Sequence, residues 1–126
     1  MKLHGPWHSA ATFLNRANLF RPSAFLALFT LATAFGLLDL STSFLALAKG
    51  MSEGNVLVLA LARSSGINVM TALEAAKVAF ILGCGAACMI GVKLRSSQTQ
   101  ALAFSVLALF AVVQAAASLS NILQLI

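Results

Sequence analysis

Three ionisable side chains, Asp39, Glu74 and Lys77, stand inside long apolar stretches of this chain. A charged group at membrane depth costs at least a few kcal/mol, so such groups normally face the interior of a helix bundle and find partners there. An acidic and a basic group at the same depth can form an ion pair that holds two helices together. They can also form a site, either a titrating carboxylate or a pocket for a small polar ligand. Both interpretations stay open at this point.

Helix geometry places Asp39 and Lys77 at similar depths. Asp39 lies about nine residues before the end of the first apolar stretch, and Lys77 lies about nine residues after the start of the second. At about 1.5 Å per residue, each lies roughly 13 Å from the same side of the membrane. We therefore expect an ion pair between Asp39 and Lys77.

Polar side chains recur at helical spacing around these charges. Residues three or four apart share one face of a helix, and Ser43 shares the face of Asp39. The residues expected to meet in a buried polar cluster are Asp39, Thr42, Glu74, Lys77, Gln114, Ser118 and Asn121. Gly83, Ala87 and Gly91 are small and spaced four apart, which predicts a face where a neighbouring helix approaches closely.

The elements that must carry these residues are three transmembrane helices. Each apolar stretch exceeds the roughly 20 residues that a helix needs to cross a membrane. The expected spans are residues 23–48, 68–91 and 100–125. We predict an all-α polytopic membrane protein, with a basic segment at 1–21 and a single three-helix domain at 22–126.

A polar turn follows the first span. It contains Glu53 and Asn55, and Asn55 is a good N-cap for a short helix at 55–63. This helix is too short to cross the membrane, so we expect it at the interface.

The N-terminal segment leaves two alternatives open. Residues 9–20 can form an amphipathic helix that lies in the headgroup region, with Trp7 as an interface anchor. The alternative is a disordered tail.

Composition points to the same class of protein. Of the 126 residues, 60% are hydrophobic and 9% are charged, whereas a soluble domain has about 25% charged residues. The net charge of +5 resides mainly in residues that flank the apolar stretches rather than in one basic face, which disfavours nucleic-acid binding.

The distribution of basic residues predicts the orientation. One side of the membrane receives Lys2, Arg16, Arg21, Lys93 and Arg95. The other receives Lys49 and Arg63. The positive-inside rule then predicts a multi-pass protein of the cell (inner) membrane, with the N-terminus cytoplasmic and the C-terminus outside.

The sequence contains none of the common catalytic motifs, and we predict no catalytic residues and no cofactor. We also expect no metal site, because Gly5 and Pro6 separate His4 from His8 and disfavour a helix there. The pair Cys84 and Cys88 is expected to serve in packing. The leading hypothesis is a non-catalytic membrane protein, an accessory or assembly subunit of a larger complex or a self-associating helical module. The alternative is a small oligomeric channel or transporter that uses the polar cluster.

The spacing of seven polar and glycine residues also resembles a known pattern. The residues that carry it are Asp39, Thr42, Gly50, Glu53, Asn55, Lys77 and Asn121. The pattern D-x-x-T, G-x-x-E-x-N-P, K and N is similar to that of a family of small, uncharacterised prokaryotic membrane proteins. The resemblance covers residues 36–126 and implies a three-helix domain with no established activity. Val56 stands where the family has proline, which weakens the entry to the short helix.

Overall fold

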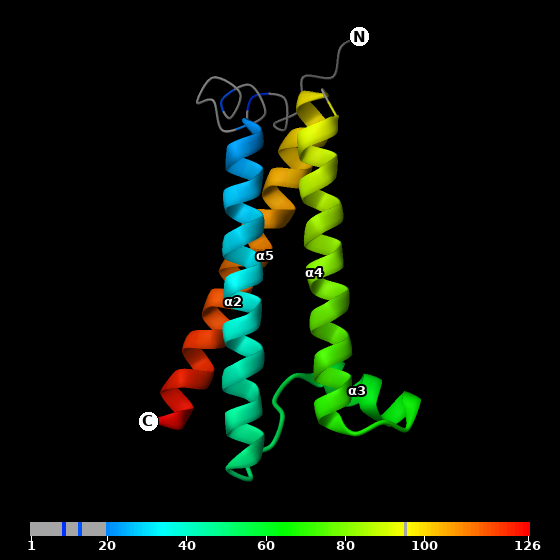
Figure 1. The fold of residues 1–126 in the computed structure, drawn as a ribbon, viewed down its shortest axis with the longest axis vertical. Coiled ribbons are helices and arrows are strands. Elements are labelled where there is room, and N and C mark those ends of the chain that lie inside the picture. The colour runs from blue at the N-terminus through cyan, green and yellow to red at the C-terminus, as the bar shows by residue number, and fades with distance from the viewer. Residues whose placement is uncertain (1–8, 10–12, 14–19, 95) are drawn as a thin grey trace.

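The computed structural model describes Ser9, Phe13 and residues 20–94 and 96–126. Over these residues all regular structure is helical, and its four elements are α2 (Pro22–Ala48), α3 (Val56–Ser65), α4 (Val69–Lys93) and α5 (Ser97–Leu125) (Figure 1). Three of them, α2, α4 and α5, are long and apolar enough to cross a membrane. The prediction of an all-α protein with three spans is confirmed. The alternatives for residues 9–20 fall almost entirely outside the described residues.

Proline and glycine set the limits of α2. Pro22 occupies the first turn, where its fixed φ suits a helix and its missing N–H is not needed. At the other end Gly50 adopts a φ of +80°, and its N–H donates to the carbonyl of Leu47 at 3.0 Å. This left-handed residue is the usual way to end a helix, because glycine enters that region without steric cost.

Asparagine side chains begin the next two helices. Asn55 Oδ1 accepts from the N–H groups of Leu57 and Val58, at 3.0 and 3.4 Å. Asn68 Oδ1 accepts from the N–H of Thr71 at 2.8 Å. Each cap satisfies donors that the first turn would leave open, and is typically worth about 1 kcal/mol. The predicted short helix is thereby confirmed, and it extends to Ser65.

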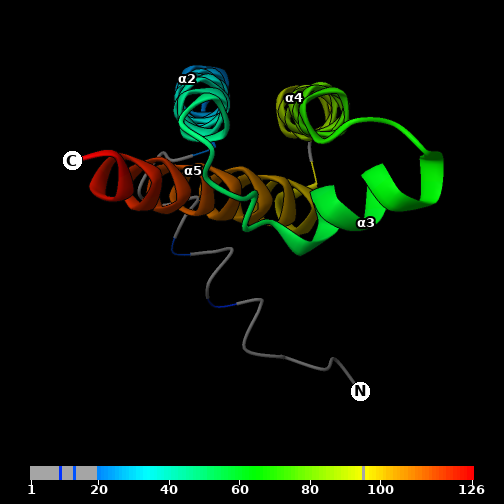
Figure 2. The same ribbon diagram turned by 90° about the horizontal axis from the view of Figure 1, so that it is seen from below.

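The three spans form two layers. Seen from below, α2 and α4 lie side by side, and α5 crosses beneath both (Figure 2). The helix α3 extends sideways from the end of the bundle where α2 ends and α4 begins (Figure 1). It packs on α4 by placing Val58 and Ala62 against Ala72 and Leu73. The sideways direction suits an element lying at a membrane surface.

Two apolar clusters hold the bundle, one toward each end. The larger contains Phe20 and Phe25 beside Phe104, with Phe25 fully buried and its ring centroid 6.0 Å from that of Phe104. The smaller joins α3 to the start of α4. The polar residues of α2, α4 and α5 lie along these helices between the two clusters.

Candidate functional site

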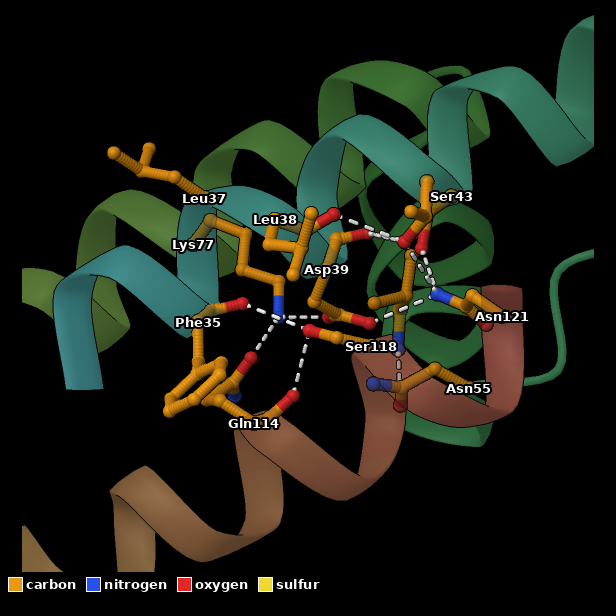
Figure 3. Close-up of polar contacts among 12 residues, drawn as sticks. Phe35, Leu37, Leu38, Asp39, Ser43, Asn55, Lys77, Gln114, Ser118 and Asn121 are labelled. Atoms are coloured by element: carbon orange, nitrogen blue, oxygen red, sulfur yellow. Dashed lines mark hydrogen bonds and ion pairs between the residues drawn. The ribbon is translucent and has the colours of Figure 1, made fainter. Parts of the chain in front are cut away.

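The centre of the bundle is an ion pair between Asp39 of α2 and Lys77 of α4 (Figure 3). The ammonium also donates to Gln114 Oε1 of α5 at 2.6 Å. Asp39 is 7% exposed and Lys77 8%, so the pair is shielded from its surroundings. Lys77 therefore joins all three spans, and the sequence prediction that Asp39 and Lys77 lie at the same depth agrees with this geometry.

The second oxygen of the Asp39 carboxylate is bound from α5. Asn121 Nδ2 donates to Asp39 Oδ1 at 2.9 Å (Figure 3). The same amide nitrogen lies 3.0 Å from Ser43 Oγ and 3.3 Å from Thr42 Oγ1. Since a carboxylate only accepts, the nitrogen of the Asn121 amide must face Asp39. Asp39 is thus held by one cation and one amide from two different helices.

Ser118 adds a contact between α5 and the backbone of α2. Its hydroxyl lies 3.0 Å from the carbonyl oxygen of Phe35 and 2.8 Å from that of Gln114, and it donates its single proton between them. Ser118 is 2% exposed. A hydrogen bond to a backbone carbonyl fixes the spacing of the two helices next to the ion pair.

An aromatic ring and a glycine complete the surroundings of Lys77. Its Nζ lies 5.8 Å from the centroid of the Phe80 ring, within the range where a cation is attracted to the ring face. Gly36 on α2 lies against this ring, since a Cβ there would be in van der Waals contact with Phe80 Cε1 at 3.4 Å. The Phe80 ring and Gly36 thus cover a side of Lys77 that the amides and the carboxylate do not contact.

A pocket opens beside this network, toward the α2–α3 loop. Its volume is about 490 Å³, and the buried Asp39 forms part of its lining. The other residues that line it are Ser43, Ala46, Leu47, Ser52, Glu53, Gly54, Asn55, Leu73, Ala117, Ser120, Asn121 and Gln124. The sequence did not predict the contributions of the loop or of Ser120 and Gln124, because no local pattern marks them.

Glu74 does not join the polar cluster. The structure places it on the exposed side of α4, and over the described residues no ion pair other than Asp39–Lys77 is present. Lys77 points into the bundle toward α2 and α5, whereas Glu74, about 60° further around α4, lies on the side that these helices do not cover. The other six predicted members, Asp39, Thr42, Lys77, Gln114, Ser118 and Asn121, do come together.

The predicted packing face of small residues is only partly realised. Gly91 is buried against the ring of Phe25, and Ala87 packs against the larger apolar cluster. Gly83 is exposed, with nothing within 4 Å of the position of a Cβ. Four-residue steps drift by about 40° per step around a helix, so the spacing carries Gly83 out of the face. The buried side is instead continued by Cys84 and Cys88, which are free thiols in the core.

The turn before α3 is organised by Glu53 and Asn55. Glu53 Oε1 accepts from the backbone N–H of Asn55 at 2.8 Å, while Asn55 caps the helix. Val56 provides the first residue of α3 without the proline of the family pattern.

The arrangement can hold a charge in a low-dielectric surrounding and offer one carboxylate to a pocket. It joins Asp39, Lys77, Gln114 and Asn121 into one hydrogen-bonded unit with contributions from all three spans. Among the described residues no group of three or more His, Cys, Asp or Glu side chains is placed to hold a metal ion. Comparisons with models of protein families, with curated proteins and with solved structures find no match to this chain.

Proposed function

We propose that this chain is a non-catalytic integral membrane protein that acts as a subunit, docking against another membrane helix through the outward side of α4. One observation carries this proposal: small side chains at four-residue steps spread across that side, over about 120° around the helix. They are Thr71, Ala75, Ala79 and Gly83, and all four are exposed. Small residues at this spacing let two helix backbones approach closely, and the van der Waals packing that results is one source of helix association in lipid.

The position of Glu74 supports docking through the same surface. It lies next to this stripe on the exposed side of α4, five residues from the start of the helix, or about 7–8 Å along the axis. A carboxylate that faces lipid near the edge of a span is better accommodated against a donor from a second chain. The enclosed polar network around Lys77 does not contribute to docking, since its members bond to one another.

The test replaces Gly83 with leucine. The new side chain has open space within this chain, so the fold is expected to persist while a close helix–helix contact is blocked. We expect Gly83→Leu to associate at least about tenfold more weakly than the wild type. Association is measured by pull-down with mass spectrometry and by energy transfer between labelled copies in native-lipid nanodiscs.

The matched control is Ala116→Leu, a similar enlargement at an exposed position of α5. It should leave association unchanged. Wild-type protein that remains a lone chain in native lipids at every concentration, with no captured subunit, would contradict the proposal. Energy transfer between copies would assign the partner as a second copy, and capture without transfer would assign a different subunit.

The orientation that we propose follows the basic residues. Arg21 precedes α2 and Lys93 ends α4, so both mark the same end of the bundle. Lys49 and Arg63 mark the opposite end, where the α2–α3 loop lies. The sequence adds Lys2, Arg16 and Arg95 to the side of Arg21 and Lys93, so the positive-inside rule makes that side cytoplasmic, and the pocket then opens to the outside of the cell membrane. Cysteine labelling of Ser52→Cys in intact cells tests this orientation.

The pocket favours a second candidate function, a small oligomeric channel or transporter. The pocket opens on the loop side, and Asp39 forms part of its lining. Within one chain the route does not continue, because Phe20, Phe25 and Phe104 pack together toward the other end. Transport would therefore need a second conformation or a path between copies. Liposomes with wild-type protein that show no solute or ion flux above protein-free liposomes would exclude this candidate.

A further inference from the structure

We infer that the pocket beside Asp39 is a binding site for a small organic cation, an ammonium group carried on a short apolar body. The inference goes beyond the association proposed above and requires neither a partner helix nor transport. It rests on the size of the pocket, on its charge, and on the placement of its hydrogen-bond acceptors.

The size and the walls of the pocket suit a small molecule rather than a bare ion. Its volume of about 490 Å³ lies within the roughly 300–1,000 Å³ of known ligand sites. Ala46, Leu47, Leu73 and Ala117 provide apolar wall, while the loop and α5 provide polar groups. A metal ion would leave most of this volume to water and would gain nothing from the apolar wall.

The charge of the pocket is negative because one of its two carboxylates has no cationic partner. Asp39 is neutralised by Lys77. Glu53 binds only the backbone N–H of Asn55, through Oε1, and over the described residues it forms no ion pair. The nearby Lys49 does not line the pocket, and its Nζ donates to the carbonyl oxygen of Leu125 at 3.4 Å.

Three amides line the pocket: Asn121 and Gln124 donate through their nitrogens within the chain, whereas Asn55 uses its Oδ1 to cap α3. Asn121 uses Nδ2 for Asp39, Thr42 and Ser43. Gln124 uses Nε2 for Ser120 Oγ at 3.4 Å. Over the described residues, the carbonyl oxygens of Asn121 and Gln124 and the Oε2 of Glu53 accept no hydrogen bond, so they remain as acceptors for a ligand. A ligand with several N–H donors and one positive charge matches these acceptors, whereas the unpaired Glu53 carboxylate would repel a carboxylate or phosphate.

The experiment uses n-butylammonium chloride as the probe and 1-butanol as its neutral counterpart. Binding is measured by isothermal titration calorimetry on the whole protein in phosphatidylcholine nanodiscs, after subtraction of protein-free nanodiscs. We expect saturable binding of n-butylammonium, and at least about tenfold weaker binding of 1-butanol.

Two variants locate the site. Glu53→Gln removes the charge but keeps an oxygen for the Asn55 N–H, so the α3 cap is retained, and n-butylammonium should bind about tenfold more weakly. Ala117→Leu fills the pocket and should abolish saturable binding, whereas Ala116→Leu, one residue away and outside the lining, should not change it.

Three results would overturn the inference: no saturable binding above protein-free nanodiscs, equal affinity in wild type and Glu53→Gln, or unchanged binding in Ala117→Leu. Loss of association in Gly83→Leu with retained n-butylammonium binding would show that the pocket acts independently of the α4 surface. Loss of n-butylammonium binding in Glu53→Gln with retained association would show that the α4 surface acts independently of the pocket.

Discussion

Replacing Lys77 with methionine is expected to lower the free energy of unfolding by about 3–5 kcal/mol, the usual cost of removing one partner of a buried ion pair. Methionine matches the lysine side chain up to Cε and lacks only the terminal ammonium, so the loss comes mainly from charge rather than volume. It leaves the Asp39 carboxylate enclosed with only the Asn121 amide from another helix as a donor. It also removes the donor to Gln114 Oε1. Unfolding in mixed micelles, followed by far-UV circular dichroism against the mole fraction of sodium dodecyl sulfate, measures this loss.

Adding Asp39→Asn to Lys77→Met should recover part of that stability, because no unpaired charge then remains in the bundle. Residues in direct contact show coupling of about 0.5–3 kcal/mol in such double-mutant cycles. Lys49→Met is the matched control. Lys49 is exposed and makes a single long hydrogen bond to Leu125, so its loss should stay within about 0.5 kcal/mol. Strictly additive losses for Asp39→Asn and Lys77→Met would contradict a coupled pair.

The depth of the ion pair was predictable from the sequence because helical rise is nearly constant. Asp39 lies about nine residues from the end of the first span and Lys77 about nine residues from the start of the second, so the sequence alone places both at one height. The rotation of a helix about its axis is harder to predict, since one residue shifts a side chain by about 100°. Glu74 shows the consequence: it shares the depth of the cluster only approximately and turns away from it. Apolar residues surround α4 on most sides, so hydrophobic periodicity did not reveal which side faces the bundle.

A pocket at the buried charges was one of the interpretations of the sequence, but its lining could not be predicted because it depends on two features that are not local. One is the path of the Ser52–Asn55 loop, which returns over the end of the bundle. The other is the crossing of α5 beneath α2, which brings Ser120 and Gln124 to the same opening (Figure 2). Crossing angles follow from how side chains of both helices interdigitate, and one helix alone does not determine them.

Adding a methyl group at Gly91 is the second change expected to destabilise the bundle strongly. A Cβ at this position would lie 2.8 Å from Phe25 Cζ and closer still to two other ring atoms. The ring is fully buried and lies between Phe20 and Phe104, with centroid distances of 6.4 and 6.0 Å, so it has little room to move. Gly91→Ala should therefore cost about 1–3 kcal/mol, as overpacking of a filled core does.

Gly83→Ala is the control that isolates this effect. Both substitutions exchange glycine for alanine inside α4, so both gain the same helix propensity, up to about 1 kcal/mol. At Gly83 no atom lies within 4 Å of the new methyl group, and this variant should be as stable as the wild type or more so. The difference between the two variants, measured by the same unfolding titration, then reports the contact with Phe25 alone. Equal stabilisation by both would mean that α4 does not approach α2 closely at Gly91. A loss at Gly83 as large as that at Gly91 would mean that the cost does not come from the contact with Phe25.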